Sequence, residues 1–341
     1  MNESLNQLAE DFFKNSLKTS PTSAIMRGYK EYFDQIEELT DTKFDQNLID
    51  LDKFEKRLNE IDFNNLSSKE KVTYGMLQYA FGSNKDSLLD KSWEFGAGVS
   101  GFTGYLIDYN QQMFIPDLES ADLLLKRLEL YNQFFNQVSE VQKKGLDNNR
   151  VATERNLLRT IDQIQSYLKT SLESDPLLLV NFSPEISEED VNSWKDKAKF
   201  IIESYVRPSV NSYLEQLKSE HLPKGRSDTN PGIMWIDGGE DIYLRSLRKF
   251  TGNKDITVKE VHETGLSEIE RLKKEFFDIG KNVFEDVTTP EEVIYKMQTE
   301  PSMRFESKEQ MLQMAEDIIK RAYEPPVSYT HLRAHETACY L

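Results

Sequence analysis

Apolar residues recur at helical spacing along almost the whole chain, and this pattern constrains the fold more than any other feature. In one stretch, five apolar side chains follow one another at steps of three and four residues, which places them on one face of a helix. These residues are Leu48, Leu51, Phe54, Leu58 and Ile61. The same spacing recurs over residues 124–138 and 157–168, two segments expected to pair as an antiparallel hairpin. The chain is therefore predicted to be all-α.

Helix starts are marked by capping boxes. In this motif a hydroxyl accepts a hydrogen bond from a free backbone N–H, and a carboxylate or amide three residues later returns one. The pairs are Ser67 with Glu70, Thr257 with Glu260, Ser307 with Gln310, and Thr289 with Glu292. The last pair also has Pro290 at the first helical position, where proline costs no helical hydrogen bond. Each pair predicts the first residue of a helix.

Strand signals are few. The best candidate is the short apolar run Gly232–Ile236, which lies between Pro231 and the Gly238-Gly239 turn. Leu177–Val180 is a weaker candidate. We therefore expect at most a short strand or hairpin near residues 232–238. Gly145, which follows one of the helical patterns, is predicted to be a C-terminal helix cap.

The domain organisation is left open by the length, because 341 residues fit one large helical domain or two smaller ones. The helical pattern gives way to a glycine-rich, aromatic stretch over residues 93–116. A subdomain break is expected there. The sequence contains no clear internal repeat.

Charge excludes one class of partner. Lys and Arg total 42 against 59 Asp and Glu, so the formal net charge is −17 at pH 7. Such a protein repels phosphate backbones, and nucleic acid is not expected as a partner. With 38% apolar and 11% aromatic residues, the chain has enough material for a core.

Cellular location is inferred by searching the sequence for a membrane-spanning segment and for an N-terminal signal peptide. No apolar run reaches the roughly 20 residues that cross a bilayer, and the start does not look like a signal peptide. We expect no membrane span and a cytoplasmic location for the sequence as given. A secreted or periplasmic location stays open if Met1 is not the true start.

The last fifteen residues, 327–341, are interpreted as a non-native tail that follows a helical region over residues 1–326. The segment VSYTHLRAHET looks like one reading frame of a sequencing-library adapter, and such scars are excluded from site reasoning. The tail carries four side chains of types that bind zinc. They are His331, His335, Glu336 and Cys339, the last being the only cysteine of the chain. Because these four residues lie in a segment interpreted as non-native, we reject them as a metal site.

Two further motifs are rejected on context. Gly96, Gly98 and Gly101 have the spacing of a dinucleotide-binding fingerprint, but no βαβ unit surrounds them. His262-Glu263 begins like a zinc-peptidase helix, but Leu266 stands where the second histidine would have to be. His262 is instead predicted to be a packed or hydrogen-bonded structural residue.

The segment Gly232–Leu272 carries a resemblance to a known family. Its turn, caps and helices follow one another in a recognisable order. The matching residues are Gly238, Gly239, Glu240, Tyr243, Arg248, Thr251, Thr257, Glu260, His262, Gly265, Leu266 and Glu268. On these residues the chain resembles the family known as domain of unknown function 885 (DUF885), bacterial proteins regarded as zinc metallopeptidase-like. The resemblance extends over nearly all of residues 1–326.

The resemblance implies peptide-bond hydrolysis by a larger parent protein. In the family, the zinc-binding helix lies beyond the point where this chain stops, and no residue here matches it. We therefore expect no catalytic or metal-binding residue in this chain, whereas the parent would use zinc and a peptide substrate. By resemblance, Gly238, Gly239, Glu240 and Tyr243 line the substrate cleft. A plain turn into a helix explains the same residues.

Two functions remain open at this point. The chain is either the N-terminal helical portion of a metallopeptidase-like enzyme, inactive alone, or a non-catalytic helical scaffold or binding protein. The first hypothesis predicts that the helices over residues 291–298 and 308–323 leave apolar faces uncovered. The sequence does not indicate an oligomeric state.

Overall fold

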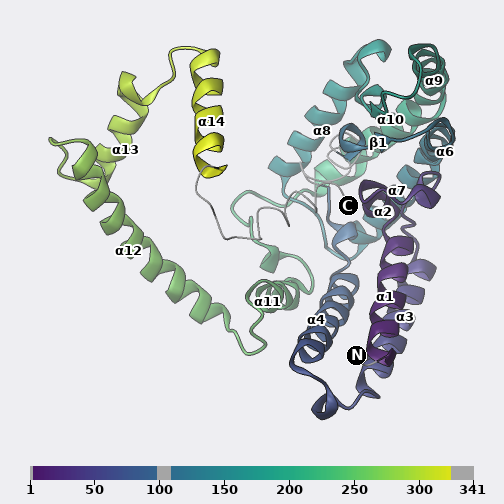
Figure 1. Cartoon of the computed structure of the whole chain (residues 1–341), viewed down its shortest axis with the longest axis horizontal. Helices are drawn as coiled ribbons and strands as arrows, with labels where there is room; N and C mark the ends of the chain where they lie inside the picture. Colours follow the sequence, from purple (N-terminus) through teal and green to yellow (C-terminus); the bar gives the residue numbers. More distant parts are fainter. Residues whose placement is uncertain (1–2, 98–108, 324–341) are drawn as a thin grey trace. The chain divides into compact units, whose positions relative to one another are not determined.

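The structure is a computed structural model that describes residues 3–97 and 109–323 (Figure 1). It is divided into two compact units, Met1–Lys249 and Phe250–Leu341. The predicted all-α fold class is confirmed, because helices account for nearly all regular structure in the described residues. The subdomain break expected near residues 93–116 stays a prediction; the boundary between the two units falls at residue 249.

The helices of the first unit form an N-terminal group and a central group. The N-terminal helices are α1 (Glu3–Thr19), α2 (Pro21–Met26), α3 (Asp41–Asn59) and α4 (Ser68–Asp90). The central helices are α6 (Leu118–Glu129), α7 (Tyr131–Asp147), α8 (Glu154–Lys169), α9 (Glu188–Ile201) and α10 (Arg207–Gln216). Helix α11 (Gly239–Thr251) follows and runs two residues past the unit boundary.

Helices α1, α3 and α4 pack as a bundle around an aromatic core. The ring of Phe12 makes edge-to-face contacts with Phe54 and Phe81, at centroid distances of 5.6 and 4.8 Å. Leu51, Phe54 and Leu58 are buried, as the spacing of the α3 sequence predicts, whereas Leu48 and Ile61 are only half-buried. A second and larger core lies among α2 and α6 to α10.

The hairpin expected of residues 124–138 and 157–168 is replaced by another arrangement: the first segment is divided at Leu130 between α6 and α7, and α7 and α8 belong to a group of three helices. Helix α10 packs against both of them, and direct contact between α7 and α8 is slight. The Tyr213 hydroxyl of α10 donates a hydrogen bond of 2.9 Å to the Gln142 side chain of α7. The pairing prediction was wrong because it was based on adjacency in the sequence, which does not reveal that the later helix α10 packs against both α7 and α8.

The strand prediction at Gly232–Ile236 was wrong. Ile233–Trp235 forms a 3₁₀ turn instead, in which each bonded N–H reaches the carbonyl three residues earlier. The described residues hold two short strands, β1 (Phe114–Ile115) and β2 (Asn181–Phe182), paired in parallel. Strand β2 therefore begins one residue after the weaker candidate Leu177–Val180, whose first residues also form a 3₁₀ turn.

The predicted capping boxes at Ser67, Thr257 and Thr289 are present with both hydrogen bonds. At Ser307 only one of the two forms: its hydroxyl accepts from the backbone N–H of Gln310, while the Gln310 side chain accepts from the N–H of Glu306. These starts were predictable because all partners lie within four residues.

Gly145 is not a helix cap. It lies inside α7, which ends at Asp147, and the left-handed residue after the helix is Asn149, with φ of 51°. A Cβ at position 145 would lie 2.1 Å from the carbonyl oxygen of Glu94. The glycine is therefore required by close packing of two backbone segments, which the local sequence does not reveal.

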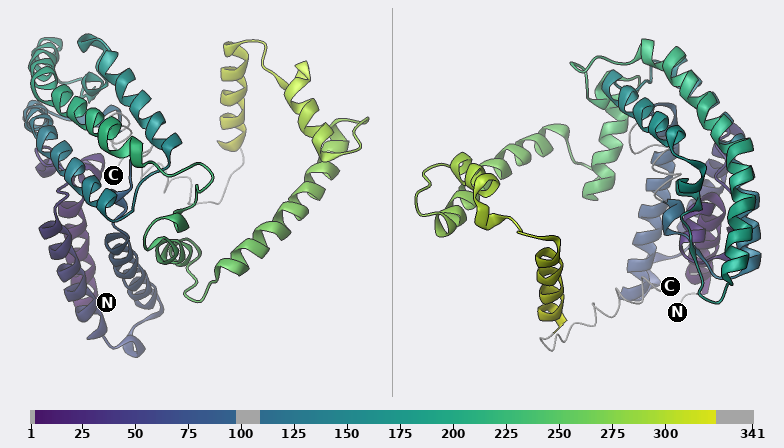
Figure 2. Two further views of the ribbon diagram at one scale, coloured as in Figure 1. Left: turned by 180° about the vertical axis from the view of Figure 1, so that it is seen from behind. Right: turned by 90° about the horizontal axis from the view of Figure 1, so that it is seen from above.

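Helices α9 and α10 belong to one continuous helix that contains two π-helical turns, Ile202–Val206 and Leu217–His221 (Figure 2). Each turn ends two residues before a proline, Pro208 or Pro223. A proline inside a helix lacks the N–H that would bond the carbonyl four residues back, and its ring clashes with that carbonyl. The wider turn relieves this clash, so the two prolines account for both positions.

The second unit consists of α12 (Val258–Val283), α13 (Pro290–Thr299) and α14 (Lys308–Tyr323). Its core is small: Phe284, Val287 and Val293 are buried, with two phenylalanines packed beside them. Large apolar side chains of α13 and α14 are left exposed, as the sequence predicts for these helices. They are Ile294, Tyr295, Met297, Met311, Leu312, Met314, Ile318 and Ile319.

Candidate functional site

The cleft residues predicted by resemblance lie in a tight turn that leads into α11. Gly238 has φ of 72°, in the left-handed region that favours glycine. A Cβ on Gly239 would lie 1.9 Å from the carbonyl oxygen of Ile233. Both glycines are thus explained by the turn itself, which does not require a ligand close to the backbone.

Arg226 holds the loop before this turn in place. Its guanidinium donates hydrogen bonds of 2.7 Å to the carbonyl of Val151 and of 2.8 Å to those of Asn230 and Gly232. Partial burial lowers the pKa of Arg226. Sequence reasoning missed this residue, because its partners are carbonyl oxygens that any residue supplies.

Polar contacts also fix the turn and α11 to the region after α7 and to α4. Asn149 donates to Asp237 at 3.0 Å, and the Tyr79 hydroxyl donates to the backbone carbonyl of Lys249 at 2.6 Å. Arg245 pairs with Asp90, and both side chains are less than a quarter exposed. The turn and the first part of α11 therefore form a rigid element.

The side chains around the turn face solvent. Tyr243 is 39% exposed, Trp235 is 50% exposed and Met234 is 59% exposed. Glu240 is also exposed. An exposed group of aromatic and apolar side chains on a rigid turn can bind a ligand, but it offers no paired acid and base for catalysis.

The remaining sequence candidates are not brought together. His262 was predicted to be packed or hydrogen-bonded, and the packed alternative was wrong, because the residue is exposed on α12, whose apolar face is itself uncovered. His331, His335, Glu336 and Cys339 lie outside the described residues, as do Gly98 and Gly101. Gly96 is described and half-buried.

Zinc does not fit the described residues. Within residues 3–97 and 109–323, no group of three or more His, Cys, Asp and Glu side chains is placed to hold a metal ion. A zinc site needs three or four such ligands converging on one point. No chemical step through a metal ion is therefore assigned to this part of the chain.

A buried polar cluster around His221 went unnoticed in the sequence. His221 is 2% exposed at the end of the second π turn, and its Nδ1 lies 3.4 Å from the carbonyl oxygen of Gln216. Burial lowers the pKa of His221, opposed by the backbone carbonyls of Gln216 and Gln142. The cluster lies between α7 and the long helix, and both His221 and Gln142 are buried, so we interpret it as structural.

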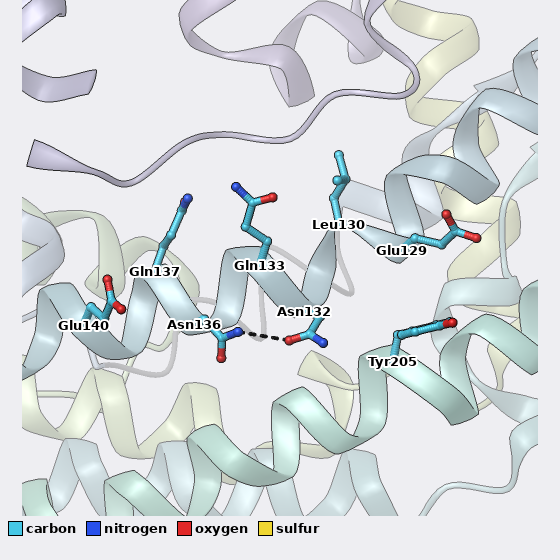
Figure 3. A pocket seen from close by; sticks show the side chains of 8 residues that line it. All are labelled: Glu129, Leu130, Asn132, Gln133, Asn136, Gln137, Glu140 and Tyr205. Atoms are coloured by element: carbon cyan, nitrogen blue, oxygen red, sulfur yellow. Dashed lines mark hydrogen bonds between the residues drawn. The ribbon is translucent and has the colours of Figure 1, made fainter. Parts of the chain in front are cut away.

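A shallow depression of 620 Å³ lies along α7. Figure 3 shows amide side chains at successive turns of this helix, with Asn132 and Asn136 on the side facing Tyr205. Asn136 donates to Asn132 at 3.1 Å. The depression is open and lined by exposed polar side chains, which is typical of a solvated helix face.

A more enclosed cavity of 430 Å³ lies where α1, α3 and α4 meet the start of α2. Serine, threonine and asparagine side chains line much of it, together with aromatic rings that include Trp93 and Tyr109. Glu37 lies at its wall and accepts hydrogen bonds from the backbone N–H and the hydroxyl of Thr22, at 2.9 and 2.8 Å. Its volume is within the usual range for small-molecule sites, roughly 300–1,000 Å³.

Comparison with known protein families matches residues 21–337 to "Bacterial protein of unknown function (DUF885)". The chain belongs to the DUF885 family. The match extends into the segment 327–341 that is interpreted as non-native, up to residue 337. No curated protein matches the chain.

Among solved structures, this DUF885 chain is similar to one described as "The crystal structure of the putative lipoprotein from Colwellia psychrerythraea". The TM-score is 0.77 at 16% sequence identity. The similarity covers 93% of this chain but 58% of that one, so the chain spans less than two thirds of its structural relative. At this identity the likeness shows the fold alone.

None of the helices in the described part of this DUF885 protein combines the length and the apolar character that crossing a bilayer requires.

Proposed function

We propose that this chain is the N-terminal helical portion of a longer DUF885 protein that hydrolyses peptide bonds, and that it contributes one wall of the substrate cleft. Family membership over residues 21–337 supports this, as does the 58% share of the related structure. In this proposal, zinc ligands and catalytic groups come from the remainder of the parent, and the chain alone is inactive.

The observation that carries the proposal is the uncovered apolar surface of the second unit. Over residues 308–322, the part of α14 whose burial the structure describes, every residue is exposed, although the helix sequence is amphipathic. Apolar side chains gain roughly 25 cal/mol for each Å² removed from water, so helices like this are stable only when a partner covers them. The rest of a longer polypeptide is the simplest source of that partner.

The proposed cleft wall is the element Gly238–Tyr243 with its neighbours Met234 and Trp235. Its rigid attachment through Arg226 and Arg245 would let it hold a peptide in a fixed position, because a preorganised surface loses little entropy on binding. The exposed Glu240 would favour substrates with a positive charge nearby.

Two experiments test this function. The purified chain is first assayed for bound zinc by elemental analysis and for hydrolysis of a fluorogenic peptide library; neither is expected. One tightly held zinc ion per chain would overturn the proposal. In the full-length parent, Tyr243→Ala and Trp235→Ala should then raise KM for peptides while leaving the melting temperature unchanged.

Glu263→Gln on the exposed face of α12 is the matched control and should leave KM unchanged. If the parent hydrolyses no peptide, the hypothesis of a non-catalytic scaffold or binding protein is favoured. If it does but the two aromatic variants behave like the control, the cleft assignment alone fails.

We further propose that the protein acts outside the cytoplasm. The related Colwellia structure is described as a lipoprotein, which supports a secreted or periplasmic location and counts against the cytoplasmic location expected from the sequence. Fractionation of cells that express the full-length gene tests this: recovery in the cytoplasmic fraction would refute it.

A further inference from the structure

The cavity among α1, α3 and α4 is separate from the proposed peptide cleft, and its lining indicates a ligand class of its own. It lies at the junction of the two cores of the first unit: Phe12 packs with the core of the N-terminal bundle, whereas Leu39 and Phe44 belong to the central core. Small-molecule sites are common at such junctions.

The charges of the lining exclude anions. Its only charged side chains among the described residues are the carboxylates of Glu37 and Glu38, with no Lys, Arg or His. A phosphate or carboxylate would find no cation in the lining to pair with, and Lys249, which is outside the lining, already donates to the Ser87 hydroxyl at 3.2 Å.

The same carboxylates do not call for a cationic ligand. Glu37 is 11% exposed at its side chain, lies 3.8 Å from the guanidinium of the buried Arg127, and accepts two hydrogen bonds from Thr22. Its charge is already compensated. Glu38 is exposed and accepts from the Thr40 hydroxyl at 2.9 Å, and solvent screens its charge. A neutral ligand is therefore favoured.

The uncharged polar groups define what that ligand must carry. The side-chain amides of Asn15 and Asn47 are half-buried in the lining and have no hydrogen-bond partner among the described residues. The hydroxyl of Ser16 already donates to a backbone carbonyl, at 2.7 Å, which leaves its oxygen free to accept. The hydroxyl of Ser87 donates to a backbone carbonyl at 2.9 Å and accepts from Lys249 Nζ at 3.2 Å. Amides that donate and accept, beside a hydroxyl oxygen that accepts, match ligand hydroxyl groups.

Aromatic rings supply the apolar part of the surface. Phe12, Phe44, Trp93 and Tyr109 all line the cavity. Flat rings next to amides and hydroxyls suit a ligand with hydroxyl groups around its edge and C–H groups on its faces. We propose that this cavity binds a neutral polyhydroxylated molecule of monosaccharide to disaccharide size.

The test uses matched sugars that differ in charge. Saturation-transfer difference NMR on the full chain is run with neutral hexoses and their disaccharides (glucose, galactose, mannose, cellobiose, maltose and lactose), and with glucose 6-phosphate and glucosamine. At least one neutral sugar should bind saturably, and the phosphate should bind at least about tenfold more weakly than glucose or not at all. No binding by any neutral sugar at millimolar concentration, or stronger binding of the phosphate or of glucosamine, would overturn the proposal.

Variants locate the site. Asn47→Leu and Asn15→Leu should each abolish the transfer signal, whereas Asn136→Leu, the same change at an exposed amide on α7, should leave it intact. Unchanged far-UV circular dichroism and urea midpoints show that the variants are folded. If one cavity variant fails to fold, the other decides, together with quenching of Trp93 fluorescence by the sugar in a Trp235→Phe background. Binding that survives both asparagine changes refutes the site.

Discussion

Gly145 offers a direct test of the packing between α7 and the segment after α4. A Cβ there would lie 2.1 Å from the carbonyl oxygen of Glu94 and 2.9 Å from that of Arg150. Both obstacles are backbone atoms, which cannot rotate away as a side chain can. Gly145→Ala therefore forces the end of α7 away from residues 92–94, where Glu94 pairs with Arg150 at 3.2 Å.

Two opposing effects determine how far Gly145→Ala changes the free energy of unfolding. Alanine in a helix interior is favoured over glycine by about 1 kcal/mol. Overpacking a tight contact costs roughly 1–3 kcal/mol, and loosening a buried ion pair adds to that cost. We expect Gly145→Ala to lower the free energy of unfolding by about 2 kcal/mol net.

The chain provides a matched control for this change. Gly75 and Gly82 lie inside α4, and a Cβ at either position would have no atom within 4 Å. Gly82→Ala should stabilise the protein by about 1 kcal/mol. Urea unfolding followed by circular dichroism measures both variants, with midpoints compared at constant slope. If Gly145→Ala stabilises the protein as much as Gly82→Ala does, the packing argument is wrong.

Three other predictions follow from buried or uncovered side chains. Asp175 has no exposed surface and pairs with Arg207 at 2.8 Å, so Arg207→Ala should lower the free energy of unfolding by about 3–5 kcal/mol in urea, and an apolar replacement of both residues should recover much of it. Burial lowers the pKa of His221; the neutral ring therefore stabilises the fold above the unfolded-state pKa of about 6.5, and urea midpoints should fall as the pH drops below it, less so in His221→Gln. The uncovered face of α14 should enhance the fluorescence of anilinonaphthalene sulfonate, and replacing Ile318 and Ile319 by Glu should reduce the enhancement; equal signals would show that another surface binds the dye.

Helices and their starts could be predicted because the information is local. The capping box at Thr257 needs one hydroxyl and one carboxylate three residues apart, and both hydrogen bonds form within that span. Burial of Leu51, Phe54 and Leu58 follows from spacing alone. These features depend on a single turn or a single helix face.

Features set by distant neighbours could not be predicted. The apolar run at Gly232–Ile236 finds no partner strand, so it folds into a 3₁₀ turn with Met234 and Trp235 exposed. The proposed cleft residues were identified by resemblance, whereas Arg226, which holds their loop, has no signature of its own. The sugar-sized cavity draws its lining from residues 12 to 109, and no periodic pattern connects them.

The two π turns could be predicted only in part. The proline that causes each turn is visible in the local sequence, whereas the effect of the turn on packing involves distant residues. Each precedes a proline by two residues, a spacing visible in the sequence at Val206-Arg207-Pro208 and His221-Leu222-Pro223. A π turn holds one extra residue, which rotates the helix after it by about 100° relative to an unbroken α-helix. The first turn precedes α10 and so contributes to the direction in which Tyr213 meets Gln142; the second places His221 in the core. A proline within a helical pattern, usually taken as a helix end, here predicts a change in helical phase.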